Sequence, residues 1–550
     1  MPAQSRPSLL TRTPPAAPRR TQRATGPVGP VLVRILGVIG VILACLVLVA
    51  PWALFTARTE ANFGPHVAVY SVTADATITV DFGPLGELLI PADGLLPLGL
   101  GAQVDVEEIP AESALGGTTL DALGQDIASY ATFFTAPEAQ LDAVARGLIR
   151  DFAVREFGAG LGLAAVVGVL AVLSGPRQRF RPPRARAAVG AVSGTVVVLL
   201  IAALVVPIQR PRPIDPNPAF VGTPLEGAQV TGRLSGVIDE VAKLVADFAS
   251  ANDAFYTTAL QSLDSGWEER PLTVRLTPGS SLVPPPTEGV WRGAEAGEHV
   301  ITAVFASDLH CNVGMTRVVA DVVARADADL YIDGGDITMT GTPAENYCLD
   351  SLDHELPDGL PKVFVKGNHD SLDTVAHARG SGWTVLDGEP VEVAGLRFFG
   401  DGDPRRTVFG QPEPLLETGE TTAEFTSRMT TESCAAEPDV LLIHDPRQAQ
   451  ESLGVGCARF ALHGHWHRRV GPEPFGRGAR FVNSTTGGAL ANALTPGPLK
   501  MPAELTIIRF DGSTGTPLDL QVVTVDMAAQ AEISPWLRIP QPGPWLPQSE

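Results

Sequence analysis

The sequence predicts a two-part protein: a membrane-anchoring half followed by an α/β domain. Three long apolar stretches, separated by arginine-rich segments, precede residue 209. After Val300, short apolar strands alternate with helical segments, which is typical of an α/β domain whose sheet is largely buried. Eight of the ten histidines lie between residues 310 and 467, inside that second part. At 550 residues the chain is long enough for two or more folded units.

The apolar stretches are long enough to cross a bilayer. Ile35–Phe55, Phe157–Ser174 and Ala187–Ile208 contain 21, 18 and 22 residues, and a membrane-spanning helix needs roughly 17–25. The second is short and rich in Gly and Ala, so a buried helix of a soluble domain is its alternative. A signal peptide is the alternative for the first, but the long leader and the lack of a clear A-x-A site favour a retained helix. No ionisable residue lies within the three stretches, which disfavours a transporter pathway.

The charge distribution predicts which side of the membrane each part occupies. Residues 1–34 contain six Arg and no acidic residue, and residues 176–187 contain five Arg and no acidic residue, within a chain of net charge −21. Under the positive-inside rule both segments are cytoplasmic, and residues 56–156 and 209–550 lie outside the cytoplasm. We therefore expect a multi-pass protein of the cell membrane, with the lipid bilayer as one partner. The acidic remainder argues against binding of nucleic-acid duplexes, because these require basic faces.

Cysteine usage agrees with an oxidising location. Cys45 lies in the first apolar stretch, which leaves an even number of cysteines outside it, Cys311, Cys348, Cys434 and Cys457. The first two of these follow predicted strands, whereas the last two each precede one. We therefore predict the disulfides Cys311–Cys348 and Cys434–Cys457 out of the three possible pairings, with four free buried thiols as the alternative.

The segments before residue 300 have simple patterns, and the one at 56–156 is expected to have a packing or docking role and to carry no chemistry. Residues 1–30 have the composition of a disordered tail. Short alternating runs separated by Gly and Pro predict a small antiparallel sheet within residues 66–110. Residues 118–155 are expected to be helical and to lead into the second apolar stretch. Leu234–Leu263 has apolar residues at helical spacing, and Pro284–Pro286 marks a linker.

The α/β part is expected to begin with a strand, a helix and a strand, at Ile301–Ala306, Met315–Ala326 and Leu330–Ile332. Later strands are predicted at Lys362–Val365, Val391–Phe399, Val440–Ile443, Phe460–Leu462, Arg480–Asn483 and Leu505–Phe510. Five polar motifs follow the ends of these strands: Asp308-Leu309-His310, Gly335-Asp336, Gly367-Asn368-His369-Asp370, His444, and Gly464-His465-Trp466-His467. Because ligands gather at the carboxyl ends of strands in open α/β sheets, we expect the five motifs to converge on one site.

The residue types in these motifs point to a pair of metal ions. The candidate ligands are oxygen or imidazole nitrogen without a thiolate, which suits Mn, Fe, Zn, Ni or Co better than a structural zinc site. Two metals about 3.5–4 Å apart can neutralise the oxygens of a phosphate ester and supply hydroxide, while a carboxylate between them bridges both. Chance alone would produce D-x-H about 0.5 times in this composition, but G-N-H-D only about 0.001 times. The motifs are therefore informative together and in this order.

The set D-x-H, G-D-x-x-x-x-G (Gly335 to Gly341), G-N-H-D, H and G-H-x-H resembles the calcineurin-like metallophosphoesterase superfamily, over about residues 297–526. The resemblance, to a membrane-anchored bacterial type, implies a β-sandwich flanked by helices with the site at one sheet edge. It implies that one metal ion is bound by Asp308, His310 and His467, and a second by Asn368, His444 and His465. It also implies that Asp336 bridges the two ions and that His369 stabilises the transition state or protonates the leaving oxygen. The G-D-x-x-D-R-G form of the Ser/Thr protein phosphatases is absent, which counts against protein phosphatase activity.

Several neighbouring residues have competing interpretations. His463 lies inside a predicted strand and is expected to be a core histidine rather than a ligand. His354 and His377 are expected at the surface. Asp370 either holds His369 by a hydrogen bond or caps the following helix. Asn483-Ser484-Thr485 fits a glycosylation acceptor, but its position at a strand end favours a turn.

We therefore expect a membrane-anchored enzyme that uses two divalent or trivalent metal ions to hydrolyse phosphate mono- or diesters outside the cytoplasm. Its candidate substrates are small or lipid-derived phosphoesters, those of the cell envelope among them. The alternative is a membrane receptor or scaffold whose domain binds metal without turnover. The expected order of segments is a basic tail (1–34), a membrane helix (35–55), an extracytoplasmic segment (56–156), a membrane helix (157–174), a basic loop (175–186), a membrane helix (187–208), a juxtamembrane helix and linker (209–296), the α/β domain (297–526) and a tail (527–550).

Overall fold

The computed structural model describes residues 28–63, 66–92, 96, 99–107, 137–174, 214–220, 227–233, 238–275, 299–407, 413–490 and 498–540. The third predicted membrane helix, the basic loop before it, the tail at 1–27 and the Pro-rich linker lie outside these residues. The chain divides into a unit that contains the long apolar helices and a unit that contains the sheets.

Two long helices contain the first and second apolar stretches. Helix α1 spans Val28–Thr56 and helix α3 spans Pro137–Ser174. Their segments Ile35–Thr56 and Leu141–Val169 have the length and composition to cross a membrane. Only 6% of the second segment is buried, so it is not a core helix of the described chain. The helix predicted at 118–155 is confirmed from Pro137 onward, and its earlier part lies outside the described residues.

A small sheet follows α1, as predicted for the region after the first stretch. Its order is β1-β2-β5-β3-β4-β6. The prediction of an antiparallel sheet is wrong at one pair, because β5 lies between β2 and β3 and runs parallel to β3. A hairpin already pairs β3 with β4, so β5 takes the remaining edge of β3. The strands are β1 Arg58–Phe63, β2 His66–Thr73, β3 Thr77–Asp81, β4 Glu87–Pro91, β5 Gly101–Val106 and β6 Gln229–Val230.

The α/β domain is built on two mixed sheets. The first has nine strands in the order β11-β10-β9-β8-β20-β21-β23-β7, with β22 paired to β21. Its strands are β7 Val274–Arg275, β8 Val300–Ala306, β9 Leu330–Asp333, β10 Lys362–Phe364, β11 Thr384–Val385, β20 Ala503–Asp511, β21 Pro517–Val525, β22 Ala531–Ile533 and β23 Trp536–Arg538. The second has the order β12-β13-β16-β17-β19-β18. Its strands are β12 Val391–Val393, β13 Leu396–Phe399, β16 Val440–Leu442, β17 Phe460–His463, β18 Val470–Phe475 and β19 Gly478–Val482.

The two sheets pack face to face, which confirms the predicted β-sandwich. Phe305 and Ile332 of the first sheet share a buried cluster with Phe398, Leu442 and Phe460 of the second. Alternate residues of the same strands point to the opposite face of each sheet, where helices cover them. This burial on both faces explains why the strands appear as continuous apolar runs in the sequence.

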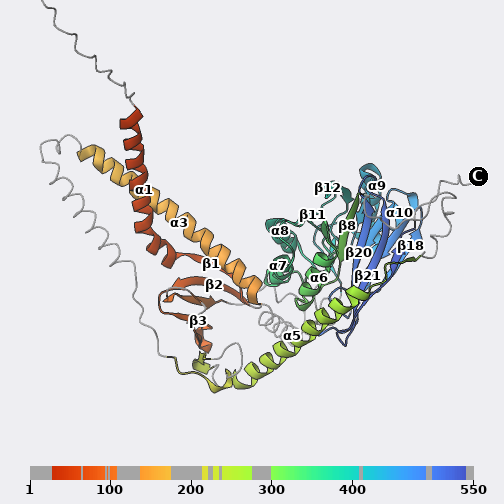
Figure 1. Ribbon diagram of the computed structural model, residues 1–550, viewed down its shortest axis with the longest axis horizontal. Helices are drawn as coiled ribbons and strands as arrows, with labels where there is room; N and C mark the ends of the chain where they lie inside the picture. Colours follow the sequence, from red (N-terminus) through yellow and green to blue (C-terminus); the bar gives the residue numbers. More distant parts are fainter. Residues whose placement is uncertain are drawn as a thin grey trace, which may run out of the picture. The chain divides into compact units, whose positions relative to one another are not determined.

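Helices cover the outer face of each sheet (Figure 1). The first sheet is covered by α5 Ile238–Glu269, α6 Gly314–Arg325, α7 Asn346–Glu355 and α8 Leu372–Gly380, and the second by α9 Thr422–Ala436 and α10 Gln450–Val455. Helix α6 is amphipathic, and its valines at 318, 319, 322 and 323 are buried against the sheet.

The domain is larger than the sequence suggested. Helix α5 was expected to be a juxtamembrane element, but its Tyr256, Leu263 and Trp267 lie in the core beneath the first sheet. The segment after 526 was expected to be a tail, yet β22 and β23 extend the sheet by pairing with β21. Strand β7, from the predicted linker region, pairs in turn with β23. These short segments are hard to recognise because two or three residues show no periodicity.

One predicted strand is in fact a hairpin. Val391–Phe399 divides into antiparallel strands β12 and β13, joined by Ala394 and Gly395. Both of these residues have positive φ, at 50° and 83°, as a two-residue hairpin turn requires.

Both predicted disulfides are confirmed. Cys311 is bonded to Cys348 and Cys434 to Cys457, with Cα–Cα distances of 4.9 and 4.4 Å. Cys45 of α1 is free.

Candidate metal centre

The five polar motifs converge at one edge of the sandwich. Strands β8, β9 and β10 run parallel in the first sheet, as do β16 and β17 in the second, so their carboxyl ends face the same side. The loops after these strands carry every residue that the sequence predicted for the site. No predicted ligand is left elsewhere in the domain.

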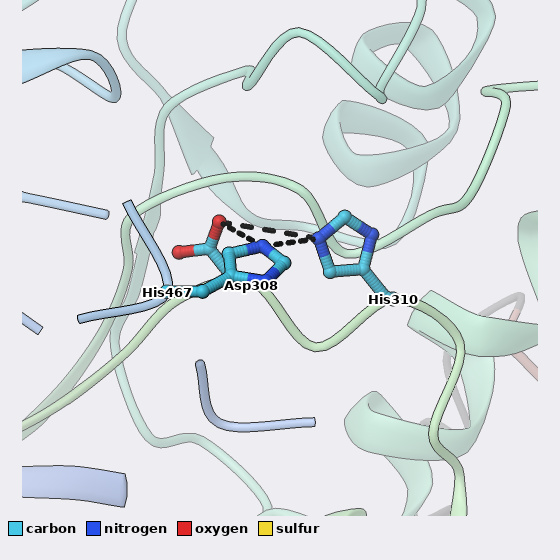
Figure 2. Close-up of side chains that lie close together, drawn as sticks. All are labelled: Asp308, His310 and His467. Atoms are coloured by element: carbon cyan, nitrogen blue, oxygen red, sulfur yellow. Dashed lines mark hydrogen bonds and ion pairs between the residues drawn. The ribbon is translucent and has the colours of Figure 1, made fainter. Parts of the chain in front are cut away.

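Asp308, His310 and His467 form a first group that could hold a metal ion. Asp308 Oδ1 lies 3.3 Å from His467 Nε2 and 4.0 Å from His310 Nε2, and the two imidazole nitrogens are 3.0 Å apart. Figure 2 shows the carboxylate and the two rings turned toward one another. Asp308 and His310 are buried and His467 is partly exposed.

Asp336, His444 and His465 form a second such group. His444 Nε2 lies 3.0 Å from Asp336 Oδ2 and 3.9 Å from Asp308 Oδ1. Asp336 Oδ2 also lies 3.9 Å from His310 Nε2 in the first group. The Asp336 carboxylate therefore stands between the two groups, where a bridging ligand would be needed.

Asn368 presents an oxygen without a partner. Its Nδ2 donates to Thr407 Oγ1 at 2.7 Å, which fixes the amide. Its Oδ1 is buried and has no hydrogen-bond partner within the described part of the chain. A buried orphan acceptor is costly, and a cation beside it would remove that cost.

Backbone carbonyls orient three of the histidines. Nδ1 lies 2.7 Å from a carbonyl oxygen in each: Gly334 for His444, Ala489 for His467 and Met339 for His369. Because a carbonyl can only accept, Nδ1 carries a proton in each ring, and Nε2 is the nitrogen that offers a lone pair once it is deprotonated. For His444 and His467 this is the nitrogen that faces the carboxylates, as in many metal-ligating histidines.

The backbone at the site is unusual for residues with side chains. A left-handed conformation, with φ between 47° and 69°, occurs at Asp308, His310, Cys311, Asp336, His465 and His467. Such conformations are strained for non-glycine residues and gather at functional sites. Two glycines allow the close packing: a Cβ on Gly367 would overlap the Asp336 carboxylate, and one on Gly464 would overlap Ser307 and Asp308.

The electrostatics favour ionised carboxylates. Burial alone would raise the pKa of Asp336, but His444 and His369 outweigh it, so that the pKa lies well below its usual value. Burial would lower the pKa of His444, but Asp336 and Asp308 raise it to about 10. Burial and the nearby His369 lower the pKa of His310 to about 3. A cation bound here would replace the proton on His444, as metal binding to histidine requires.

Asp370 has neither of the two roles that the sequence suggested. Its carboxylate accepts hydrogen bonds from the backbone N–H of Asp336, Gly367 and Thr338, at 2.7, 2.9 and 3.0 Å. Ser371, not Asp370, caps α8. Asp370 thus ties the loop after β9 to the loop after β10 and sets the position of Asp336.

The neighbouring residues behave largely as predicted. His463 is buried in β17 with Nδ1 at 2.7 Å from Ile443 O, so it is a core histidine. His354 and His377 are more exposed, with side chains 41% and 30% accessible. Asn483 is fully buried and donates to Ser484 O and Glu504 O, which excludes it as a glycosylation acceptor in this fold.

Sequence reasoning missed three polar residues beside the site. Asp445, Arg405 and Arg447 form an ion-pair network that reaches His465. The only signal was the position of Asp445 directly after His444 at a strand end. The two arginines had no signal: Arg405 lies in the two-residue strand Arg405–Arg406, and Arg447 lies in the short helix Pro446–Ala449.

Comparisons with known proteins find a family model and solved structures that are similar to part of the chain. Residues 301–469 match the family model described as calcineurin-like phosphoesterase. No curated protein shows detectable similarity to the chain. Similar solved structures include the protein TT1561 of Thermus thermophilus, at 11% identity and a TM-score of 0.31, covering 42% of this chain and 100% of that one. A phosphatase from Mycoplasma pneumoniae has 11% identity and a TM-score of 0.29, covering 42% and 94%.

A further solved structure, a novel archaeal phosphodiesterase, has 14% identity and a TM-score of 0.24, covering 40% of this chain and 97% of that one. The likeness to these structures is weak, so the assignment rests on the family model and on the site. Residues 301–469, with their two groups of possible metal-binding side chains, are therefore identified as a calcineurin-like phosphoesterase domain, that is, a metal-dependent phosphoester hydrolase.

Proposed function

We propose that the protein is a membrane-anchored phosphoesterase that uses two metal ions on the extracytoplasmic face. The observation that carries the proposal is the pair of Asp/His groups at the sheet edge, with the Asp336 carboxylate between them. A single-metal site would need only one such group. Two groups with a shared carboxylate are the arrangement that two-metal hydrolases require.

The proposed first position is Asp308, His310 and His467, and the second is Asn368, His444 and His465, with Asp336 common to both. The donors fit catalytic metals, because they are carboxylate, amide oxygen and imidazole with no thiolate. The orphan Oδ1 of Asn368 supports its place in the second set. Bound ions would neutralise phosphate oxygens and supply hydroxide at neutral pH.

His369 is proposed as the proton donor to the leaving oxygen. Its Nδ1–H is committed to Met339 O, so Nε2 is the nitrogen that can exchange a proton with a substrate. The ring lies edge-to-face with His310, at 4.9 Å between centroids, and this contact supports a role for His369 beside the proposed first metal. His369 N also donates to Asp336 Oδ1 at 2.7 Å, so the same loop positions both residues.

Anchoring and orientation are proposed from three features. The apolar segments of α1 and α3 have the length and composition of membrane helices. The arginine-rich segments 1–34 and 176–187 fall on one side of the membrane if all three apolar stretches cross it. The disulfides Cys311–Cys348 and Cys434–Cys457 support an oxidising location for the domain. A domain held at the extracytoplasmic surface of the cell membrane would encounter phosphoesters of lipid or cell-envelope origin.

The activity can be tested with the full-length chain in detergent. After removal of metals, the protein is reloaded with Mn, Zn, Fe, Ni or Co and given chromogenic phosphate monoesters and diesters and a panel of lipid phosphates. We expect turnover that depends on metal. A chain that binds two ions but turns over nothing in the panel would instead be the receptor or scaffold.

The orientation can be tested by adding protease to intact cells. Residues after 209 should be cleaved, whereas the arginine-rich loop at 176–187 should be protected. A protected phosphoesterase domain would contradict the proposed topology.

A further inference from the structure

Asp445 occupies an unusual position beside the second group of candidate ligands. It directly follows His444 and is buried, with 1% of its surface accessible. Its Oδ1 accepts from the backbone N–H of Arg447 at 3.0 Å and so begins the short helix Pro446–Ala449. The backbone that presents His444 is thereby tied to the Asp445 carboxylate.

Two arginines hold this carboxylate in place. Asp445 Oδ2 accepts from Arg405 Nη2 at 2.8 Å and from Arg447 Nη2 at 2.7 Å. Arg405 is itself fixed by a two-point ion pair with the buried Asp403, at 2.9 and 2.7 Å. Asp403 also accepts from Gln448 at 3.0 Å. The network balances two carboxylates with two guanidinium groups, and it leaves Asp445 little freedom to move.

The same carboxylate faces His465. His465 Nε2 lies 3.7 Å from Asp445 Oδ2 and 3.0 Å from Arg447 Nη2. Because Nε2 is turned toward Arg447 and Asp445, Nδ1 is the nitrogen of His465 that remains for the group with Asp336 and His444. This differs from His444 and His467, whose Nδ1 atoms are held by backbone carbonyls.

If Nδ1 binds a metal, the N–H group at Nε2 needs a hydrogen-bond acceptor. An imidazole that gives the lone pair of Nδ1 to a metal carries its proton on Nε2. Arg447 has only donors and cannot accept that proton, whereas Asp445 Oδ2 can. A carboxylate that accepts from the outer nitrogen of a metal-ligating histidine fixes the ring and raises its basicity.

We propose that Asp445 is a positioning residue for the second metal position, acting through His465. In the metal-loaded chain Nε2–H of His465 donates to Asp445 Oδ2, while Arg405 and Arg447 keep the carboxylate in place. The contact of Arg447 with Nε2 is then lost, but its ion pair with Asp445 remains. This inference rests on the proposed two-metal function, and it names a residue outside the predicted ligand set.

The test measures metal binding, not turnover. Full-length Asp445→Ala, Asp445→Asn and Arg447→Gln variants are titrated with Mn²⁺, and bound metal is counted by elemental analysis. Electron paramagnetic resonance then distinguishes a coupled Mn²⁺ pair from isolated ions. Asp401→Asn is the matched control, because Asp401 Oδ2 also pairs with an arginine, Arg428, at 2.8 Å, but contacts no histidine in the described residues.

We expect Asp445→Ala to bind one ion normally and the other about 10–100-fold more weakly, with loss of the coupled-pair signal. Asp445→Asn should lie between this variant and the wild type, because its amide oxygen still accepts from Nε2–H. Arg447→Gln and Asp401→Asn should retain both ions. A variant that does not fold is recognised by thermal unfolding, and the isosteric Asp445→Asn then decides the question.

Two outcomes distinguish the failures. A wild-type chain that binds fewer than two ions would overturn the two-metal function itself. A wild-type chain that binds two ions, with Asp445→Ala and Asp445→Asn indistinguishable from Asp401→Asn, would overturn the role of Asp445 alone. Loss of the second ion in Arg447→Gln as well would show that binding of this ion depends on the ion-pair network and not on the acceptor that Asp445 offers to His465.

Discussion

Replacing Cys311 and Cys348 with serine should weaken both folding and metal binding, whereas replacing Cys434 and Cys457 should weaken folding alone. Cys311 follows the candidate ligand His310, and its N–H donates to Ile337 O at 2.8 Å. The bond to Cys348 ties this loop to α7. Cys434 and Cys457 lie in α9 and just after α10, ahead of β17, whereas His465 follows that strand.

The two disulfides can be compared directly because they close loops of similar length. They close loops with sequence separations of 37 and 23 residues. Loop-closure entropy then predicts stabilisation of about 3.8 and about 3.4 kcal/mol at 25 °C. For a domain of this size, each loss should lower the unfolding temperature by roughly 7–15 °C. The two double variants should differ in metal affinity. Loss of the Cys311–Cys348 bond releases the His310 loop and should lower the affinity for the first metal about tenfold, which is the low end of the effects seen when groups that support metal ligands are removed.

The assay uses the full-length chain in detergent. Unfolding is followed by the fluorescence of the buried Trp383 and Trp536, which lie in the core beneath the first sheet. Metal affinity is measured by titration at a temperature where all variants are folded. Equal metal affinity in the two double variants would refute the idea that the bond positions His310. A wild-type unfolding temperature in either variant would refute the loop-entropy estimate for that bond.

Three further outcomes are expected. Asp336→Asn should lose both bound metals and all activity, because it removes the charge shared by the two groups; metal analysis beside a turnover assay checks this. His369→Ala should keep both metals but lose about 10²–10⁴-fold in turnover of substrates with poor leaving groups, and loss of metal in this variant would reverse the two roles. Burial raises the pKa of Asp333 to about 8, so the folded chain binds this proton more tightly than the unfolded chain does. The contribution of Asp333 to the stability of the metal-free protein should therefore be lost as pH rises from about 4 to about 8, and thermal unfolding measured across pH should show less loss over this range in Asp333→Asn than in the wild type.

The positions of the candidate site residues followed from the sequence because each motif lies at a strand end. His444 illustrates this: a lone histidine has no specificity, but its place after the apolar run Val440–Ile443 put it at the same sheet edge as the others. The disulfide pairing followed from the same strand placement. Strand placement therefore predicted where the candidate ligands gather and which cysteines pair, whereas the sandwich and the assignment of residues to each metal were implied by the family resemblance.

Other features depended on contacts that have no local signal. Helix α5 has the apolar spacing of any amphipathic helix, and only packing showed that it completes the core through Tyr256 and Leu263. Strands β22 and β23 are too short to recognise before β21 provides an edge for them. Asp370 was expected either to hold His369 or to cap α8, yet it accepts hydrogen bonds from Asp336 and Thr338, which lie in the loop after β9.

The sequence by itself determined which chemical groups this protein brings together: carboxylates, an amide and imidazoles at the ends of parallel strands. These groups can be recognised in the sequence because the chemistry of a donor residue and the periodicity of a strand are local properties. Only the tertiary structure decided how the groups are aimed, namely which nitrogen of each histidine faces Asp308 and Asp336, which ligand residues take the left-handed backbone, and how Asp445 reaches His465. The physical reason is that a hydrogen bond or ion pair is set by distances of a few ångströms between loops that can be more than 100 residues apart in the chain, as with the 2.7 Å contact between His444 and Gly334.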